Sequence, residues 1–165
     1  MKNILLPFAL MATLSAAAQS VPAKDLSFAK EAAQGGLLEV KLGELAQQKA
    51  SSESVKTLGQ HMVTDHTKAN NELKALAASR SIDLPASLST EGQAHYDRLS
   101  KLTGASFDKA YTSLMVQDHQ KDIAKFKAEA SSGTDKELRS WASQTLPTLE
   151  HHLMMSKEAD AKIHP

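Results

Sequence analysis

Cysteine is absent from this chain of 165 residues, which excludes disulfide bonds. We therefore expect a hydrophobic core to hold the fold, and we expect no lipid to be attached through cysteine at an N-terminal cleavage site. Aromatic residues make up only 4% of the sequence, and glycine and proline are scarce, with seven and five residues. Few aromatics beside much alanine, leucine, lysine, glutamate and glutamine favour an all-helical protein.

The chain also has no net charge at pH 7, because 19 basic residues balance 19 acidic ones. Removal of a predicted signal peptide that contains Lys2 leaves 18 basic residues and a net charge of about −1. Binding to phosphates needs clustered positive charge, so we expect no nucleic-acid partner. Glycine-rich phosphate loops, HExxH runs and a Ser-His-Asp order are missing too. We therefore assign no catalytic residue, and we do not expect an enzyme with a known catalytic motif.

Long apolar runs are missing except at the N-terminus. Residues 1–18 combine a basic start, an apolar run from Ile4 to Leu14 and a small-residue cleavage site that ends at Ala18. The apolar run is about half of the ~20 residues needed to span a bilayer. We predict a cleaved signal peptide, export to the periplasm or beyond, and no transmembrane segment after cleavage. The length that remains fits one domain over residues 19–165.

Apolar residues that recur at every third or fourth position predict four long amphipathic helices. We expect them at Leu26–Lys49, Glu53–Ser79, Phe107–Ala130 and Asp135–Ile163, with a shorter helix at Thr90–Leu102. Ser51-Ser52 and residues 131–133 form short turns, whereas residues 81–106 form a middle connection long enough to run along the bundle. The predicted fold is all-α: a ferritin-like antiparallel four-helix bundle with a long middle connection containing a short helix.

Two local patterns concern the ends and the interior of these helices. Thr134 and Glu137, three residues apart, form a capping-box signature for the last helix. The pair Gly35-Gly36 interrupts the first helix at a cost of roughly 1 kcal/mol per glycine relative to alanine. We interpret the pair as a close backbone approach to a neighbouring helix.

One motif occurs twice, each time in the middle of a predicted helix. Its first copy consists of Met62, Val63, Asp65, His66 and Lys68, and its second of Met115, Val116, Asp118, His119 and Lys121. Both histidines occupy core positions, and Glu39 and His152 lie at the matching depth of the other two helices. Antiparallel helices of similar length share their middle layer. We therefore predict that the side chains of Glu39, His66, His119 and His152 converge inside the bundle.

Imidazole and carboxylate groups that converge in a protected interior are what a Zn, Fe, Cu or Mn site needs. Asp65 and Asp118 each precede a histidine by one residue, about 100° around the helix. They either join the ligands or hold the histidine rings by hydrogen bonds. The alternative is a buried polar network without metal, in which the histidines pair with carboxylates and fix the register of the helices.

Four stretches carry a resemblance to a known family: AAQGGLLEVKLGELAQQKA, VKTLGQHMVTDHTKANNELKALA, MVQDHQKDIAKF and TLPTLEHHL. They are similar to an exported bacterial family catalogued as domain of unknown function 4142, in the ferritin-like superfamily. The resemblance implies a ferritin-like four-helix fold and supplies no biochemical activity. It places the family's characteristic positions on Glu39, Asp65, His66, Asp118, His119 and His152.

Ferritin-like di-iron proteins take a Glu-x-x-His motif from each of two helices. None of the seven histidines here follows a glutamate by three residues, so the set fits one transition-metal ion better than a carboxylate-bridged pair. We expect an exported metal-binding bundle that handles metal or has a redox or stress-protective role in the envelope. The alternative is a non-catalytic structural or interaction module. The sequence does not identify the metal or a protein partner, and it leaves open whether the protein forms a homodimer.

Overall fold

The structure is a computed structural model that describes residues 21–164. Within this range the chain forms five helices and no strand: α1 (Ala23–Lys49), α2 (Glu53–Ser79), α3 (Thr90–Ser100), α4 (Gly104–Ser132) and α5 (Lys136–Ile163). The predicted signal peptide lies outside the described residues. No described helix combines the length and the apolar character needed to cross a membrane.

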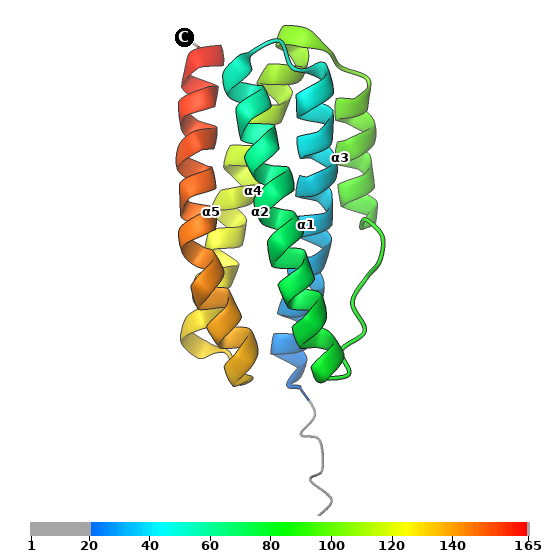
Figure 1. The fold of residues 1–165 in the computed structure, drawn as a ribbon, viewed down its shortest axis with the longest axis vertical. Coiled ribbons are helices and arrows are strands. Elements are labelled where there is room, and N and C mark those ends of the chain that lie inside the picture. Colours follow the sequence, from blue (N-terminus) through cyan, green and yellow to red (C-terminus); the bar gives the residue numbers. More distant parts are fainter. Residues whose placement is uncertain (1–20, 165) are drawn as a thin grey trace, which may run out of the picture.

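The four long helices form two antiparallel hairpins, α1–α2 and α4–α5, that lie side by side (Figure 1). Helix α2 packs beside α5, and α1 packs beside α4. The connection from α2 to α4 runs the full length of the bundle, with α3 against α1, so α2 and α4 point in the same direction (Figure 1). The predicted all-α bundle with a long middle connection is confirmed, and one such crossover is the connectivity of ferritin-like folds.

The core of the bundle divides into two apolar clusters. One includes Leu58 and Met115 and lies toward the α1–α2 turn, and the other includes Phe28 and Trp141 and lies toward the opposite end. Between them lies a layer of four buried polar side chains, one from each long helix: Glu39, His66, His119 and His152. The apolar clusters on either side therefore enclose this layer.

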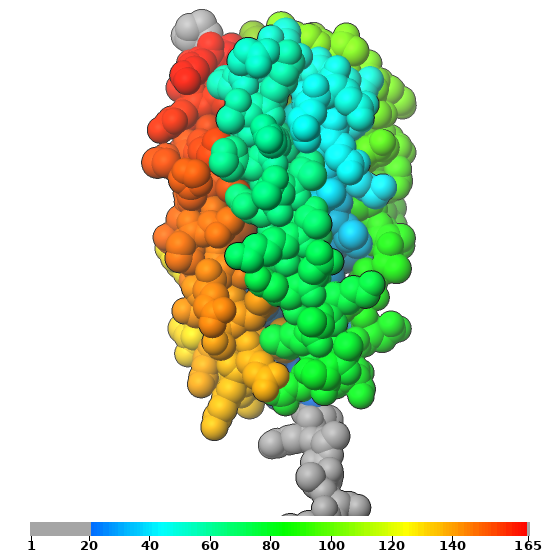
Figure 2. Space-filling view, in the orientation of Figure 1, coloured from blue at the N-terminus to red at the C-terminus, as the bar shows by residue number. Residues whose placement is uncertain are grey.

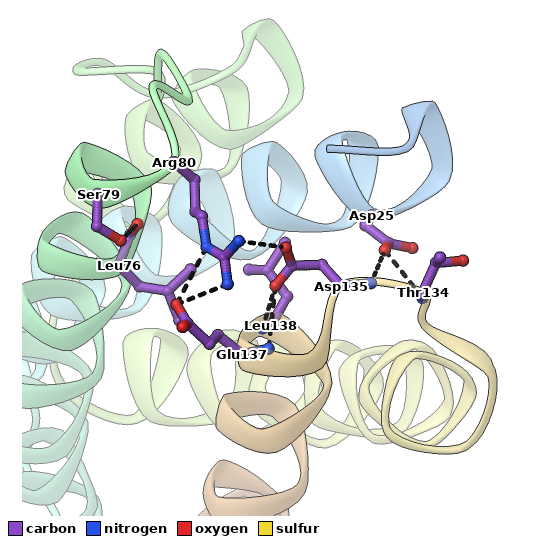
Figure 3. Close-up of polar contacts among 8 residues, drawn as sticks. All are labelled: Asp25, Leu76, Ser79, Arg80, Thr134, Asp135, Glu137 and Leu138. Atoms are coloured by element: carbon purple, nitrogen blue, oxygen red, sulfur yellow. Dashed lines mark hydrogen bonds and ion pairs between the residues drawn. The ribbon is translucent and has the colours of Figure 1, made fainter. Parts of the chain in front are cut away.

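A buried carboxylate from the first hairpin holds the turn of the second. The side chain of Asp25, in the first turn of α1, is fully buried and accepts hydrogen bonds from the backbone N–H groups of Thr134 (2.9 Å) and Asp135 (2.5 Å) (Figure 3). Arg80, at the end of α2, lies 3.4 Å from the carboxylate of Asp135 and 2.9 Å from that of Glu137 (Figure 3). Both helices of the first hairpin thus bind the α4–α5 turn.

The second hairpin makes the converse contact. Asp108, near the start of α4, is only 1% exposed and accepts hydrogen bonds from the backbone N–H groups of Ser51 (3.2 Å) and Ser52 (3.0 Å). The hydroxyl of Ser51 also donates to it, at 2.5 Å. Each hairpin therefore satisfies the turn amides of the other, and we refer to the contacts of Asp25 and Asp108 as the reciprocal carboxylate contacts.

The two local predictions need correction. Asp135, not Thr134, caps α5, because its carboxylate accepts hydrogen bonds from the backbone N–H groups of Glu137 and Leu138, both at 3.0 Å. Of the predicted glycine pair, Gly36 does lie close to α2, but against the side chain of Asn70; the close approach of two backbones lies at Gly43. A Cβ atom on Gly43 would lie 2.6 Å from the carbonyl oxygen of Gly59 on α2.

Candidate metal centre

The four predicted side chains converge at one level of the bundle. Nδ1 of His66 lies 3.0 Å from Oε2 of Glu39, and Nε2 of His119 lies 3.5 Å from Oε1 of the same carboxylate. Nε2 of His119 also lies 3.4 Å from Nδ1 of His152. Each of the three histidines offers a ring nitrogen within 4.8 Å of the others. The layer deduced from the midpoints of the predicted helices is therefore present in the structure.

Hydrogen bonds on the far side of two rings fix which nitrogen carries the proton. Nδ1 of His119 lies 2.9 Å from the backbone carbonyl oxygen of Met115, and Nε2 of His152 lies 2.9 Å from Oδ2 of Asp65. A carbonyl oxygen and a carboxylate can only accept, so Nδ1 of His119 and Nε2 of His152 donate. In the neutral rings the remaining nitrogens, which face each other at 3.4 Å, each carry a lone pair.

The centre of the layer therefore gathers acceptors. Two lone-pair nitrogens cannot hydrogen-bond to each other, and the nearby carboxylate of Glu39 is an acceptor as well. Among the described residues, Oε1 of Glu39 and Nε2 of His66 have no hydrogen-bond partner, although both are buried. When Glu39 is ionised, this arrangement lacks a positive group or a proton at its centre.

The pKa values of the layer follow from its burial. Removal from water lowers the pKa of His66, His119 and His152 to about 4 each, with smaller opposing effects from nearby carboxylates. Burial also raises the pKa of Glu39 to about 7, against the opposing influence of His119. Near neutral pH the three histidines are therefore neutral, and neutral imidazole is the form that binds metal ions.

The two aspartates of the repeated motif differ in their placement. Asp65 bonds to His152 on α5 rather than to its neighbour in sequence, and its Oδ2 lies 3.9 Å from Nδ1 of His61. The carboxylate of Asp118 lies 3.7 Å from Nζ of Lys121 and lines a surface cleft. The two copies of the motif thus bring their histidines together but not their aspartates.

One acidic residue near the site had not been identified from the sequence. Asp122, one turn after His119 on α4, lines a small cavity of about 20 Å³ together with Glu39 and His66. Burial, reinforced by the negative charge of Glu39, raises the pKa of Asp122 to about 7. Its position corresponds to Ala69 in the first copy of the motif. The only signal in the sequence was therefore a departure from the repeat.

Comparison with known proteins gives a family and a shared fold, and no activity. A model of the family described as Domain of unknown function (DUF4142) matches residues 10–159. A DUF305 fragment from Deinococcus radiodurans is similar in structure, with a TM-score of 0.76 and 14% identity over 87% of this chain and 99% of that one. A candidate secreted protein of the DUF305 family from Streptomyces coelicolor has a TM-score of 0.73 and 13% identity, over 86% and 92% of the two chains. Such identities indicate a shared fold alone. No curated protein matches the chain.

Proposed function

Since the chain belongs to the DUF4142 family, whose description assigns no function, we propose from its buried layer that it is an exported protein that binds one transition-metal ion. Glu39, His66, His119 and His152 are the proposed ligands. The observation that carries the proposal is the set of lone pairs at the centre of the layer. A cation bound there would satisfy both facing nitrogens and the carboxylate at once, which no hydrogen bond among them does.

The spacing of these donors supports a single ion. Ligands bound at about 2.0–2.2 Å to one tetrahedral ion are about 3.3–3.6 Å apart. The separations of 3.4 Å between the facing nitrogens of His119 and His152, and of 3.0 and 3.5 Å from Glu39 to His66 and His119, lie near that range. Three imidazoles and one carboxylate suit Zn²⁺ best, and they also suit Cu²⁺ and Fe²⁺.

The surroundings of the rings support the same conclusion. Histidines that bind metal donate their other N–H group to a carboxylate or a backbone carbonyl. His152 does so to Asp65, and His119 does so to the carbonyl of Met115. Four ligands from the protein would also fill a tetrahedral shell, whereas catalytic zinc sites keep one position for water or substrate. We therefore propose metal handling rather than turnover.

Export is the second part of the proposal. It is supported by the signal-peptide pattern of residues 1–18 and by the description of the similar Streptomyces coelicolor protein as a candidate secreted protein. The mass of the protein purified from its native compartment tests it. A chain that begins at Gln19 is the expected result, and a chain that keeps residues 1–18 contradicts it.

Metal binding is tested by elemental analysis of the protein purified from its native compartment. We expect about one transition-metal ion per chain. After removal of metal by a chelator, Zn²⁺ at 1,000 times its Kd stabilises the fold by about 4 kcal/mol, which raises Tm by roughly 10 °C. The double variant His66→Ala/His119→Ala should lose both effects. His151→Ala is the matched control, because His151 is an exposed histidine beside His152.

The metal-free polar network gives a different set of results. It predicts no stoichiometric metal and no change in Tm on adding Zn²⁺, Cu²⁺, Fe²⁺ or Mn²⁺, and these results together refute the proposal. It also predicts that replacing His66 and His119 by leucine or methionine is neutral or stabilising, since a buried polar network is often less stable than apolar residues of similar volume.

A further inference from the structure

A cleft on the side of α1, α3 and α4 leads to the buried layer. Its volume is about 570 Å³, and its lining includes five carboxyl groups: Glu31, Glu39, Glu91, Asp118 and Asp122. Figure 2 shows another face of the bundle, where the side chains of α5 and α2 meet along most of their length and α1 is visible beside the upper part of α2. Glu39 is only 2% exposed, so the cleft reaches a ligand of the proposed metal centre at its inner end.

The carboxyl groups of the cleft differ in their partners. Near the rim, Glu31 pairs with Lys125 (2.8 Å) and Asp118 with Lys121 (3.7 Å), and the carboxylate of Glu91 lies 3.8 Å from Nε2 of His95. In the part of the chain that the structure describes, Asp122 forms no hydrogen bond or ion pair, and Oε1 of Glu39 accepts no hydrogen bond. At its inner end the cleft therefore holds the carboxyl group of Asp122, which no cation contacts directly although Lys125 acts on it at longer range, and an oxygen of Glu39 without a hydrogen bond.

Asp122 and Glu39 lie between the outer cleft and a smaller inner cavity. Both line the outer cleft, and both line the cavity of about 20 Å³ that also borders His66. Gly35 contributes to the wall of the first space and Gly36 to the wall of the second. A Cβ atom on Gly35 would lie 3.7 Å from Oδ2 of Asp122, so the absence of a side chain leaves room beside this carboxylate. The glycine pair thus lies along the boundary between cleft and layer.

We propose that this cleft is the route by which a divalent transition-metal ion reaches the buried layer, and that Asp122 with Glu39 binds the ion in transit at its inner end. The proposal rests on the metal-binding function proposed above. The five carboxyl groups of the lining outnumber its two lysines, Lys121 and Lys125. A cleft with an excess of one sign of charge concentrates ions of the opposite sign and raises their association rate by 10- to 1,000-fold, most strongly at low salt. Asp122 is a positioning residue in this scheme, because His66, His119, His152 and Glu39 hold the ion at equilibrium.

The experiment measures the rate at which the metal-free full-length mature protein takes up Co²⁺, whose visible absorption reports coordination by histidine and carboxylate. We expect Asp122→Asn to lower the second-order rate constant at least tenfold at low salt, while one Co²⁺ per chain is still bound at the end. Gly35→Leu should also slow uptake, by filling the cleft without changing its charge. Asp83→Asn is the control, because it removes the same charge from an exposed position outside the cleft.

Three results would overturn the proposal, and they differ in what else they affect. Equal uptake rates in the wild type and in Asp122→Asn, with full loading of both, exclude this route and leave the metal centre intact. Loss of bound Co²⁺ at equilibrium in a folded Asp122→Asn variant makes Asp122 a permanent ligand rather than a transit position. A wild-type protein that binds no stoichiometric Co²⁺ removes the metal-binding function itself.

Discussion

The charge of Asp122 gives a prediction in which stability and the proposed function oppose each other. Its pKa is raised from 3.8 to about 7 by burial and by the neighbouring Glu39. A carboxyl group whose pKa is higher in the folded state than in the unfolded state binds protons more strongly when folded. The free energy of unfolding therefore falls as the pH rises from about 3.8 to 7, and the loss is complete above pH 7.

Asp122→Asn removes this loss, because the amide has the same shape and no charge. A shift of one pKa unit corresponds to about 1.4 kcal/mol, so the full shift corresponds to about 4 kcal/mol. Because Asp122 is only partly buried and its titration is linked to that of Glu39, we expect a gain of roughly 2–4 kcal/mol at pH 8. The gain should shrink toward pH 4, where the carboxyl group is protonated in the folded state and close to its titration midpoint in the unfolded state.

Urea denaturation of the metal-free variant and wild type at pH 4, 5, 6, 7 and 8 measures this difference. Asp83→Asn removes a charge from an exposed position and should show no such dependence on pH. A variant that is no more stable than the wild type at pH 8 would mean that the negative charge of Asp122 is already compensated. That result would refute the reasoning about the inner end of the cleft. With the expected result, the wild-type protein keeps a destabilising charge, which is typical of functional positions.

Three further predictions concern other parts of the bundle. Gly43→Ala should lower the free energy of unfolding by about 1–3 kcal/mol, because the new Cβ atom would lie 2.6 Å from backbone. Gly35→Ala should raise the free energy of unfolding by about 0.5–1 kcal/mol, because its Cβ atom has room and alanine favours the helix. Thermal melts that rank the two variants the other way would contradict this packing. Asp65→Asn should weaken Zn²⁺ binding by 10- to 100-fold in a competition titration, since Asp65 orients the ring of His152; unchanged affinity would remove that role. Tyr111→Phe should leave stability unchanged or raise it by about 1 kcal/mol, because the buried hydroxyl has no hydrogen-bond partner among the described residues; a clear loss in chemical denaturation would reveal one.

Much of the fold followed from periodicity alone. The spacing of apolar residues located the four long helices, and the predicted bounds of α2 match the observed ones (Glu53–Ser79). The short helix α3 was located by its helical composition instead. The convergence of the layer also followed, because helices of similar length must share their midpoints. That Glu39 and His152 would join the repeated histidines needed no knowledge of the connectivity, since each long helix contributes one residue at the same depth.

What the sequence did not predict depends on contacts between distant segments. Asp25 reads locally as a residue of the first turn of α1, yet its carboxylate binds a turn more than 100 residues away. Asp122 had no recognisable pattern, because its role depends on where α3 leaves a cleft along α1 and α4. Asp118 looked equivalent to Asp65, but helix α4 turns its carboxylate toward the cleft. Periodicity locates a residue on a helix, whereas the neighbouring helices decide what it touches.

The reciprocal carboxylate contacts have a consequence for how the chain assembles. Asp25 accepts hydrogen bonds from N–H groups in the turn of the second hairpin, and Asp108 accepts them from the turn of the first. A hairpin on its own therefore lacks the carboxylate that binds the N–H groups of its turn. The two halves should therefore fold together or not at all, and separately expressed halves should gain structure on mixing. The same contacts do not distinguish a hairpin of the same chain from one of a second copy. An exchange of hairpins between two chains through the long middle connection would keep every one of them.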